Sequence, residues 1–239
     1  MATSRMVILT GAGISQESGL PTFRDANGLW EGYRPEEVAS PLAFARMPEV
    51  VQEFYDLRRR AALAVEPNAA HVALARLEQE LDRQGNSGAM VIVTQNIDDL
   101  HERAGSKRVI HMHGELNSAL CTACGSRARW TRPLADRPAC PSCGSRSLRP
   151  DIVWFGENVY RMDEIEQAVE NCETFAVIGT SGMVYPAAGL AAYAKACGAR
   201  TVLLNLEDQP LGLDYDEREI GPATKVVPEW VERYLADLA

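Results

Sequence analysis

Four cysteines in two closely spaced pairs have the pattern of a zinc site. Cys121 and Cys124 form one pair, Cys140 and Cys143 form the other, and fifteen residues separate the pairs. This separation is within the range of a Cys₄ zinc ribbon. Four thiolates complete a tetrahedral site and leave no position for water, so we expect one structural Zn²⁺. Two disulfides or unmetallated thiols are the alternatives. Six cysteines without a secretion signal favour a reducing compartment, and we expect a cytoplasmic protein.

A glycine-rich segment after the first apolar run predicts a phosphate-binding turn. Residues 6–9 are expected to form a strand, and residues 11–15 (GAGIS) follow it. Two glycines let the backbone approach a ligand closely, and the first turn of the next helix offers free N–H groups to a pyrophosphate. Gln16 stands where the usual dinucleotide fingerprint has its third glycine. We therefore expect a dinucleotide that is held differently from the cofactor of an ordinary dehydrogenase.

Further polar clusters follow the other predicted strands. We expect strands over residues 89–94, 109–111, 174–178 and 201–204. The clusters that come after them are residues 95–98, His113, residues 179–181 and residues 205–207. Ligands of an open α/β sheet bind beyond the carboxyl ends of its strands. The five clusters, counting the glycine-rich segment, therefore predict one site.

Strands that alternate with helices predict an α/β fold. Helices are expected over residues 48–65, 68–81 and 187–196, with a last helix that opens at Pro228. The pattern indicates a Rossmann-like, mostly parallel sheet with helices on both faces. We expect a single catalytic domain with a large lobe formed by residues 1–30, 68–118 and 165–239. A helical insert would occupy about residues 31–67 and the zinc-ribbon module about residues 119–150.

The charge balance limits the classes of partner. Across 239 residues, 24 Lys and Arg face 33 Asp and Glu, which leaves a formal net charge of −9. Neutralising phosphates requires clustered cations, so we do not expect nucleic acid to be a partner. No apolar run has the length that a membrane helix needs, so we do not expect a membrane partner either.

The motifs together resemble one family, the sirtuins, which are NAD-dependent protein-lysine deacylases. The matching segments occur in the family's order and span about residues 5–225: the glycine-rich segment with residues 18–19 and 23–24, residues 95–98, residues 113–114, both cysteine pairs, residues 179–181, and residues 205 and 207. The resemblance implies that NAD is consumed as a co-substrate. The nicotinamide–ribose bond breaks, the acyl group passes from lysine to ADP-ribose, and the products are nicotinamide and O-acyl-ADP-ribose. Acylated-lysine proteins or peptides would be the partners.

The resemblance assigns the catalytic roles to His113 and Asn96. Imidazole titrates near neutral pH, so His113 suits the relay of a ribose proton. Asp98 would accept from the nicotinamide amide, and it is also suited to capping the short helix that follows. An isolated histidine at a strand end would be a structural residue, which is how we interpret His111. The residues that the resemblance places around NAD are Gly11, Ala12, Gly13, Ile14, Ser15, Ser18, Gly19, Thr22, Phe23, Arg24, Trp30, Gln95, Asn96, Ile97, Asp98, His113, Gly179, Thr180, Ser181, Asn205, Leu206, Glu207 and Ala223.

Tyr55 and Arg58 bear on the class of acyl group. They are three residues apart on a predicted helix and share a face. A guanidinium beside a phenol is a good receptor for a carboxylate. The pair, with the small residue Ala39, resembles the subgroup that removes succinyl, malonyl or glutaryl groups. The alternative is that Arg58 belongs to a solvated arginine run and Tyr55 to the core.

A peptide-binding segment is implied by the same resemblance. Residues 152–157 match the extended segment that pairs with the substrate backbone, where Val153, Gly156 and Glu157 would contact the peptide. Tyr185 would lie on the facing loop. Strand addition reads little sequence, so the preferred target proteins are not predicted, and neither is the oligomeric state.

Two other functions remain open at this level. ADP-ribosyl transfer or NAD hydrolysis shares the step that releases nicotinamide. His113 and the Tyr55/Arg58 pair favour deacylation, since neither is needed merely to hydrolyse NAD. A non-catalytic NAD-sensing or interaction protein is the other alternative. The complete set of polar residues argues against it.

Overall fold

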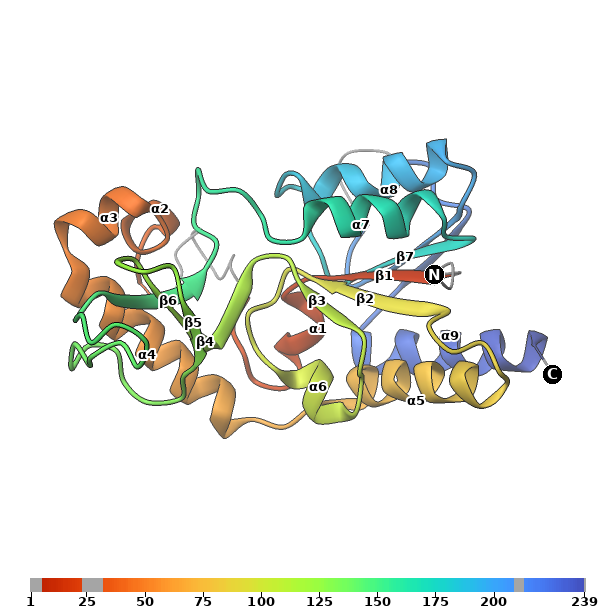
Figure 1. Cartoon of the computed structure of the whole chain (residues 1–239). Coiled ribbons are helices and arrows are strands. Elements are labelled where there is room, and N and C mark those ends of the chain that lie inside the picture. The colour runs from red at the N-terminus through yellow and green to blue at the C-terminus, as the bar shows by residue number, and fades with distance from the viewer. Residues whose placement is uncertain (1–5, 23–31, 209–212, 239) are drawn as a thin grey trace.

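The computed structural model describes residues 6–22, 32–208 and 213–238. Its main element is a six-stranded parallel sheet in the order β3-β2-β1-β7-β8-β9 (Figure 1). The strands are β1 (Met6–Thr10), β2 (Met90–Thr94), β3 (Val109–His111), β7 (Thr174–Ile178), β8 (Arg200–Asn205) and β9 (Glu217–Ile220). In the central pairs Thr10 lies beside both Thr94 and Ile178, so three strands end at the same level. The predicted parallel sheet is confirmed.

Helices cover both faces of this sheet, as the alternating pattern predicts. Figure 1 shows α5 (Ala69–Arg83) and α9 (Ala223–Asp237) on one face, and α7 (Met162–Glu170) and α8 (Ala187–Ala196) on the other. Each face has its own apolar core, because alternate residues of the buried strands point to opposite sides. The short helices α1 (Gly13–Gln16) and α6 (Leu100–Ala104) follow β1 and β2. The loops that carry the polar clusters therefore extend from a rigid sheet.

A second group of elements lies beyond the carboxyl edge of the sheet. It contains the helices α2 (Pro35–Val38), α3 (Pro41–Arg46) and α4 (Pro48–Ala64) and an antiparallel sheet in the order β5-β4-β6. These strands are β4 (Gly114–Cys121), β5 (Arg127–Arg129) and β6 (Leu148–Ile152), so the second sheet begins directly after His113. One apolar cluster joins α4 to Leu116, Ile152 and Trp154 and fixes the helix against this sheet.

The predicted start of the last helix at Pro228 is wrong. Helix α9 begins at Ala223, and Pro228 lies inside it. Proline removes one i→i−4 hydrogen bond from a helix interior. The helix continues because Val227, Trp230 and Val231 are buried against α5 and the sheet. The sequence pattern also does not predict α2, α7, β9 or the three strands of the antiparallel sheet. None of the helices in the described part of the chain combines the length and the apolar character needed to cross a bilayer.

Candidate active site

The polar clusters line one cavity of about 1190 Å³ at the carboxyl edge of the parallel sheet. Its wall is completed by residues 152–159 and 161–164 and by α4, so the cavity lies between the two groups of elements. The predicted site residues found in its lining are Gly11, Ala12, Gly13, Ser15, Thr22, Ala39, Tyr55, Arg58, Gln95, Asn96, Ile97, Asp98, His113, Val153, Gly156, Glu157, Gly179, Thr180, Ser181, Tyr185, Asn205, Leu206 and Glu207.

Some residues predicted to contact NAD lie elsewhere. Ile14 and Ala223 are buried in the core, and Ser18 accepts a hydrogen bond from the Asn68 amide on the outer side of the turn. Together with Gly19, these residues are absent from the cavity lining. The predictions for Phe23, Arg24 and Trp30 lie outside the described residues.

The glycines of the first turn are required for contact with another loop of the protein. The Gly13 N–H donates to the Gly179 carbonyl at 2.8 Å, which brings the β1–α1 turn against the loop after β7. A Cβ on Gly13 would lie 2.7 Å from the Gly179 carbonyl oxygen, and a Cβ on Gly179 would lie 2.4 Å from the Ile14 nitrogen. Gly179 also has a φ of +61°, which disfavours any side chain. Two motifs that are far apart in sequence therefore form one cradle.

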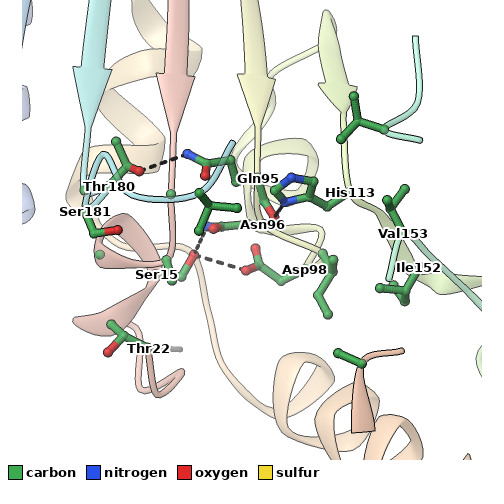
Figure 2. A pocket seen from close by; sticks show the side chains of 18 of the residues that line it. Ser15, Thr22, Gln95, Asn96, Asp98, His113, Ile152, Val153, Thr180 and Ser181 are labelled. Atoms are coloured by element: carbon green, nitrogen blue, oxygen red, sulfur yellow. Dashed lines mark hydrogen bonds between the residues drawn. The ribbon is translucent and has the colours of Figure 1, made fainter. Parts of the chain in front are cut away.

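A buried hydrogen-bonded cluster lies below this cradle (Figure 2). The Asn96 amide donates to the Ser15 hydroxyl at 3.0 Å, and that hydroxyl donates to the Asp98 carboxylate at 3.1 Å. Asp98 also accepts from the Leu100 N–H at 3.2 Å, so it both faces the cavity and holds the start of α6. Burial raises the pKa of Asp98 above its ordinary value. The cluster presents fixed hydrogen-bonding groups to the cavity.

His113 lies opposite this cluster and has a defined tautomer. Its Nδ1 is 3.1 Å from the Gln95 carbonyl oxygen, which can only accept. The proton is therefore on Nδ1, and Nε2 carries the lone pair. Burial lowers the pKa of His113, while the hydrogen bond to Gln95 opposes that shift. A neutral imidazole with a free base nitrogen is the form that a proton acceptor needs.

His111 has a structural environment, in line with its interpretation from the sequence. Its ring nitrogens lie 3.1 Å from the Asn96 carbonyl oxygen and 2.8 Å from the Glu102 carboxylate. Burial acts to lower its pKa, but the hydrogen bond and charge of Glu102 raise it overall. Both ring nitrogens are thus occupied in holding the loop after β2.

The loops after β7 and β8 form the other end of the cavity. Gln95 donates to the Thr180 hydroxyl at 3.0 Å, and Asn205 donates to the carbonyls of Thr180 at 3.1 Å and Glu207 at 2.9 Å. The Asn205 amide therefore shapes the loop that presents Glu207. Ser181 lies on the same wall (Figure 2).

Tyr55 and Arg58 reach the cavity from α4. The Tyr55 hydroxyl accepts a hydrogen bond from the Trp154 indole at 3.0 Å, and burial raises the pKa of Tyr55. Arg58 donates to the Pro21 carbonyl at 3.4 Å, which holds the guanidinium beside the first turn. Both residues are in the lining of the cavity that His113 also lines. The alternative in which Arg58 belongs only to a solvated run does not match this position.

Residues 153–157 form the rim next to His113. The Val153 N–H donates to the His113 carbonyl at 2.9 Å, and the Phe155 N–H donates to the Ala39 carbonyl at 3.0 Å. Gly156 has a φ of +91°, and the Glu157 carboxylate is held by Arg149 at 2.8 Å. The sequence interpretation missed Trp154, whose partner Tyr55 is 99 residues away, and Arg149, whose partner Glu157 is eight residues away in an irregular segment without a periodic spacing.

The four predicted zinc ligands meet at one point. Their sulfur atoms all lie within 4.8 Å of one another, with Cys121 and Cys143 3.7 Å apart and Cys124 and Cys140 3.9 Å apart. Four sulfurs at about 2.3 Å from zinc would be about 3.8 Å apart in a tetrahedron. The donor set and its geometry therefore fit a structural zinc ion.

Two matching turns build this zinc site. The Gly125 N–H donates to the Cys121 carbonyl at 2.8 Å, and the Gly144 N–H donates to the Cys140 carbonyl at 2.9 Å. The two glycines have φ values of +72° and +75°. Each pair of ligands is thus presented by a tight turn that a larger residue would strain.

The fold and the cavity together define a nucleotide-binding α/β protein that carries a structural zinc module. The chain belongs to the Sir2 family, whose sequence pattern matches residues 11–186. Curated relatives include the NAD-dependent protein deacylase SIR2rp3 of Trypanosoma brucei brucei, 53% identical over 96% of this chain and 94% of the relative. The NAD-dependent protein deacylase of Caulobacter vibrioides is 50% identical over 98% of both chains.

Solved structures agree with this assignment. A Sir2 homologue in complex with NAD superposes with a TM-score of 0.87 at 42% identity, and the match covers 98% of this chain and 90% of that chain. Sir2Af2 bound to a myristoylated histone peptide superposes with a TM-score of 0.73 at 35% identity, over 98% and 93% of the two chains.

Proposed function

We propose that this chain removes acyl groups that end in a carboxylate, above all succinyl and malonyl groups, from lysine side chains, and that it retains activity on acetyl-lysine. It is an NAD-dependent protein-lysine deacylase of the Sir2 family, with nicotinamide and O-acyl-ADP-ribose as products. The observation that carries the acyl preference is the position of Tyr55 and Arg58 on the wall of the cavity that His113 also lines.

His113 would act as the base of this reaction. Bound NAD supplies a glycosidic bond to nicotinamide that can break and a ribose that can take the acyl group. The Nε2 atom of His113 faces the cavity with its lone pair, because Nδ1 donates to the Gln95 carbonyl. It would accept a proton from a ribose hydroxyl, and burial favours the neutral form that can do so.

The Ser15, Asn96 and Asp98 cluster would orient the nicotinamide half of NAD. Asp98 offers carboxylate oxygens to the carboxamide, and Asn96 offers an amide to the ribose or to a water. The cluster is buried and internally hydrogen bonded, so its groups are positioned before the ligand arrives. At the other end, Thr180, Ser181 and Glu207 would bind the phosphates and the adenosine ribose.

Tyr55 and Arg58 would bind the distal carboxylate of the acyl group. A guanidinium can bind a carboxylate through two parallel hydrogen bonds, and the phenol adds a third donor. Ala39 lies on the same wall with a small side chain, which leaves room for an acyl chain longer than acetyl. An acetyl group has no carboxylate, so it would gain nothing from this pair.

The acylated peptide would lie along residues 153–157 as an added strand. Val153, Gly156 and Glu157 line this rim, and Tyr185, which is 73% exposed, lies on the loop after β7. A rim of this kind recognises backbone more than sequence. We also propose the two-lobed division described above and a cytoplasmic location, where reducing conditions would keep the four cysteines available to zinc.

The test measures kcat/KM for acetyl-, succinyl- and malonyl-lysine peptides while following both nicotinamide and O-acyl-ADP-ribose. Arg58→Met should lower kcat/KM for the succinyl peptide by roughly 10- to 150-fold, which corresponds to losing about 1.5–3 kcal/mol from a charge-assisted hydrogen bond. Deacetylation should change little. Arg60→Met is the matched control, because Arg60 belongs to the same arginine run but is exposed and does not line the cavity.

The Arg58 and His113 variants and the nicotinamide readout each give a result that can contradict the proposal. Equal losses with both peptides in Arg58→Met would refute carboxylate recognition. His113→Tyr should abolish formation of O-acyl-ADP-ribose from every peptide. Nicotinamide release that needs no acylated peptide would instead favour NAD hydrolysis.

A further inference from the structure

Trp154 makes a hydrogen bond that controls the chemistry of the Tyr55 hydroxyl. It follows β6 and is only 2% exposed, and its indole Nε1 lies 3.0 Å from the Tyr55 oxygen. The two rings are tilted at 35° with their centroids 6.3 Å apart. Both residues line the cavity, yet they are 99 residues apart in the chain. The contact therefore joins α4 to the rim segment that carries the peptide in the proposed function.

The direction of this hydrogen bond follows from the chemistry of the two groups. An indole N–H can only donate, so the Tyr55 oxygen is the acceptor. The single proton of the phenol must then point away from the indole. Burial raises the pKa of Tyr55, so the phenol keeps this proton at neutral pH. An ionised carboxylate can only accept, and a phenol whose proton is directed away from Trp154 is a suitable donor to it.

The indole itself is held firmly. The Arg149 guanidinium lies over its ring at 3.6 Å from the centroid, and Phe44 packs against it at 5.1 Å. Arg149 is fixed in turn by two bonds of 2.8 Å to the Glu157 carboxylate. The backbone N–H of Trp154 also donates to the Glu157 carboxylate, at 2.9 Å, which holds the main chain that carries the indole. Since the ring is fixed from both sides, the direction of its N–H is fixed as well.

We propose that Trp154 is a specificity-determining positioning residue of the acyl site. Its indole N–H occupies the acceptor side of the Tyr55 hydroxyl, so that the phenol presents its proton to the carboxylate of the acyl group. The inference rests on the proposed recognition of acidic acyl groups. It adds Trp154 as the residue that sets the direction of the Tyr55 hydroxyl proton. Trp154 would act through Tyr55 and would not contact the carboxylate itself.

A simple packing role for Trp154 predicts a different result. If the indole only fills the space between α4 and the rim, its loss would disturb all substrates alike and would add to the loss of Tyr55. If it acts through the Tyr55 hydroxyl, its loss affects only acidic acyl groups and has no effect once that hydroxyl is absent. A double-mutant cycle separates the two cases.

The experiment compares Trp154→Phe, Tyr55→Phe and the double variant with succinyl- and acetyl-lysine peptides at saturating NAD. We expect Trp154→Phe to lower the ratio of kcat/KM for the succinyl peptide to kcat/KM for the acetyl peptide by about five- to tenfold, as for a lost orienting hydrogen bond. The double variant should be no worse than Tyr55→Phe. Equal effects on both peptides, or losses that add in the double variant, would overturn the inference.

Trp130→Phe is the matched control. Trp130 is also buried and lies under an arginine, Arg132, at 4.5 Å, but it is in the zinc module. Within the described residues its Nε1 has no hydrogen-bond partner. This variant removes an equivalent buried indole without removing a hydrogen bond, and it should leave the ratio of the two activities unchanged. A changed ratio would show that loss of any buried indole alters selectivity, and would overturn the inference.

A second measurement does not require Trp154→Phe to fold. The chain has four Trp, so its NMR spectrum should contain few indole N–H resonances. The resonance of Trp154 can be assigned by elimination, with variants of the other three Trp. Tyr55→Phe should shift this resonance upfield, because the acceptor of the N–H is lost. An unmoved resonance would overturn the inference. Failure of the proposed function would give a different result. In that case Arg58→Met would lower the activities on the succinyl and acetyl peptides by the same factor.

Discussion

The buried carboxylate of Asp56 offers the sharpest test of how α4, the helix of the proposed acyl site, is held in place. Asp56 lies on α4 beside Tyr55 but on an adjacent face of the helix. It accepts hydrogen bonds from the Leu134 N–H at 2.8 Å and the Ala135 N–H at 2.9 Å, both in the zinc module. It also forms an ion pair with Arg59 at 2.5 Å, and the two side chains are only 4% and 2% exposed. One carboxylate therefore joins α4 to the zinc module.

Replacing Asp56 with Asn should be strongly destabilising. The change removes the charge that compensates Arg59, whose pKa is lowered by burial while the charge and hydrogen bond of Asp56 oppose that shift. It also places an amide N–H₂ among groups that are themselves donors. Breaking one partner of a buried ion pair costs about 3–5 kcal/mol. For a chain of this size, that loss corresponds to a Tm lower by roughly 6–20 °C.

The assay is thermal and urea unfolding of the zinc-loaded protein, followed by circular dichroism. Arg59→Met should be milder than Asp56→Asn, because Asp56 keeps its two backbone donors. Asp136→Asn is the control, since Asp136 is an exposed acid of the same module, and surface changes usually stay within about 0.5 kcal/mol. An Asp56→Asn variant as stable as this control would refute the reasoning.

Two other predictions concern NAD binding and the pH dependence of stability. Gly179→Ala should weaken NAD binding at least about fivefold by calorimetry, because its Cβ would lie 2.4 Å from the Ile14 nitrogen. Gly198→Ala, with φ +92° and open space around it, tests the cost of the backbone angle alone and should bind NAD normally. His71 is buried, which lowers its pKa from 6.5 to about 4, so the unfolded chain takes up a proton in this range that the native protein does not. Stability should therefore fall as the pH drops from 6.5 towards 4, by at most roughly 1.4 kcal/mol per pH unit. Urea unfolding of wild type and His71→Gln should show a shallower slope in the variant, and parallel slopes would contradict this reasoning.

The sequence by itself determined the features that depend on neighbouring residues. The apolar runs specify the strands β1 and β7, and Asn68, the first residue of the predicted helix over 68–81, caps α5. The two Cys-x-x-Cys turns specify their own geometry through the glycine that follows each pair. Because parallel strands present their carboxyl ends at one edge, the sequence alone assigns the polar clusters to a single site. Local chemistry and strand direction are enough for these conclusions.

Only the tertiary structure decided which of these residues work as pairs. Gly13 and Gly179 require each other because their backbones meet, and Trp154 donates to Tyr55 across 99 residues of chain. The same is true of Asp56 and the zinc module. Pro228 remains inside α9 because burial of that helix outweighs one missing hydrogen bond. Such contacts join segments that share no local pattern, so their partners can be identified only when the chain is folded.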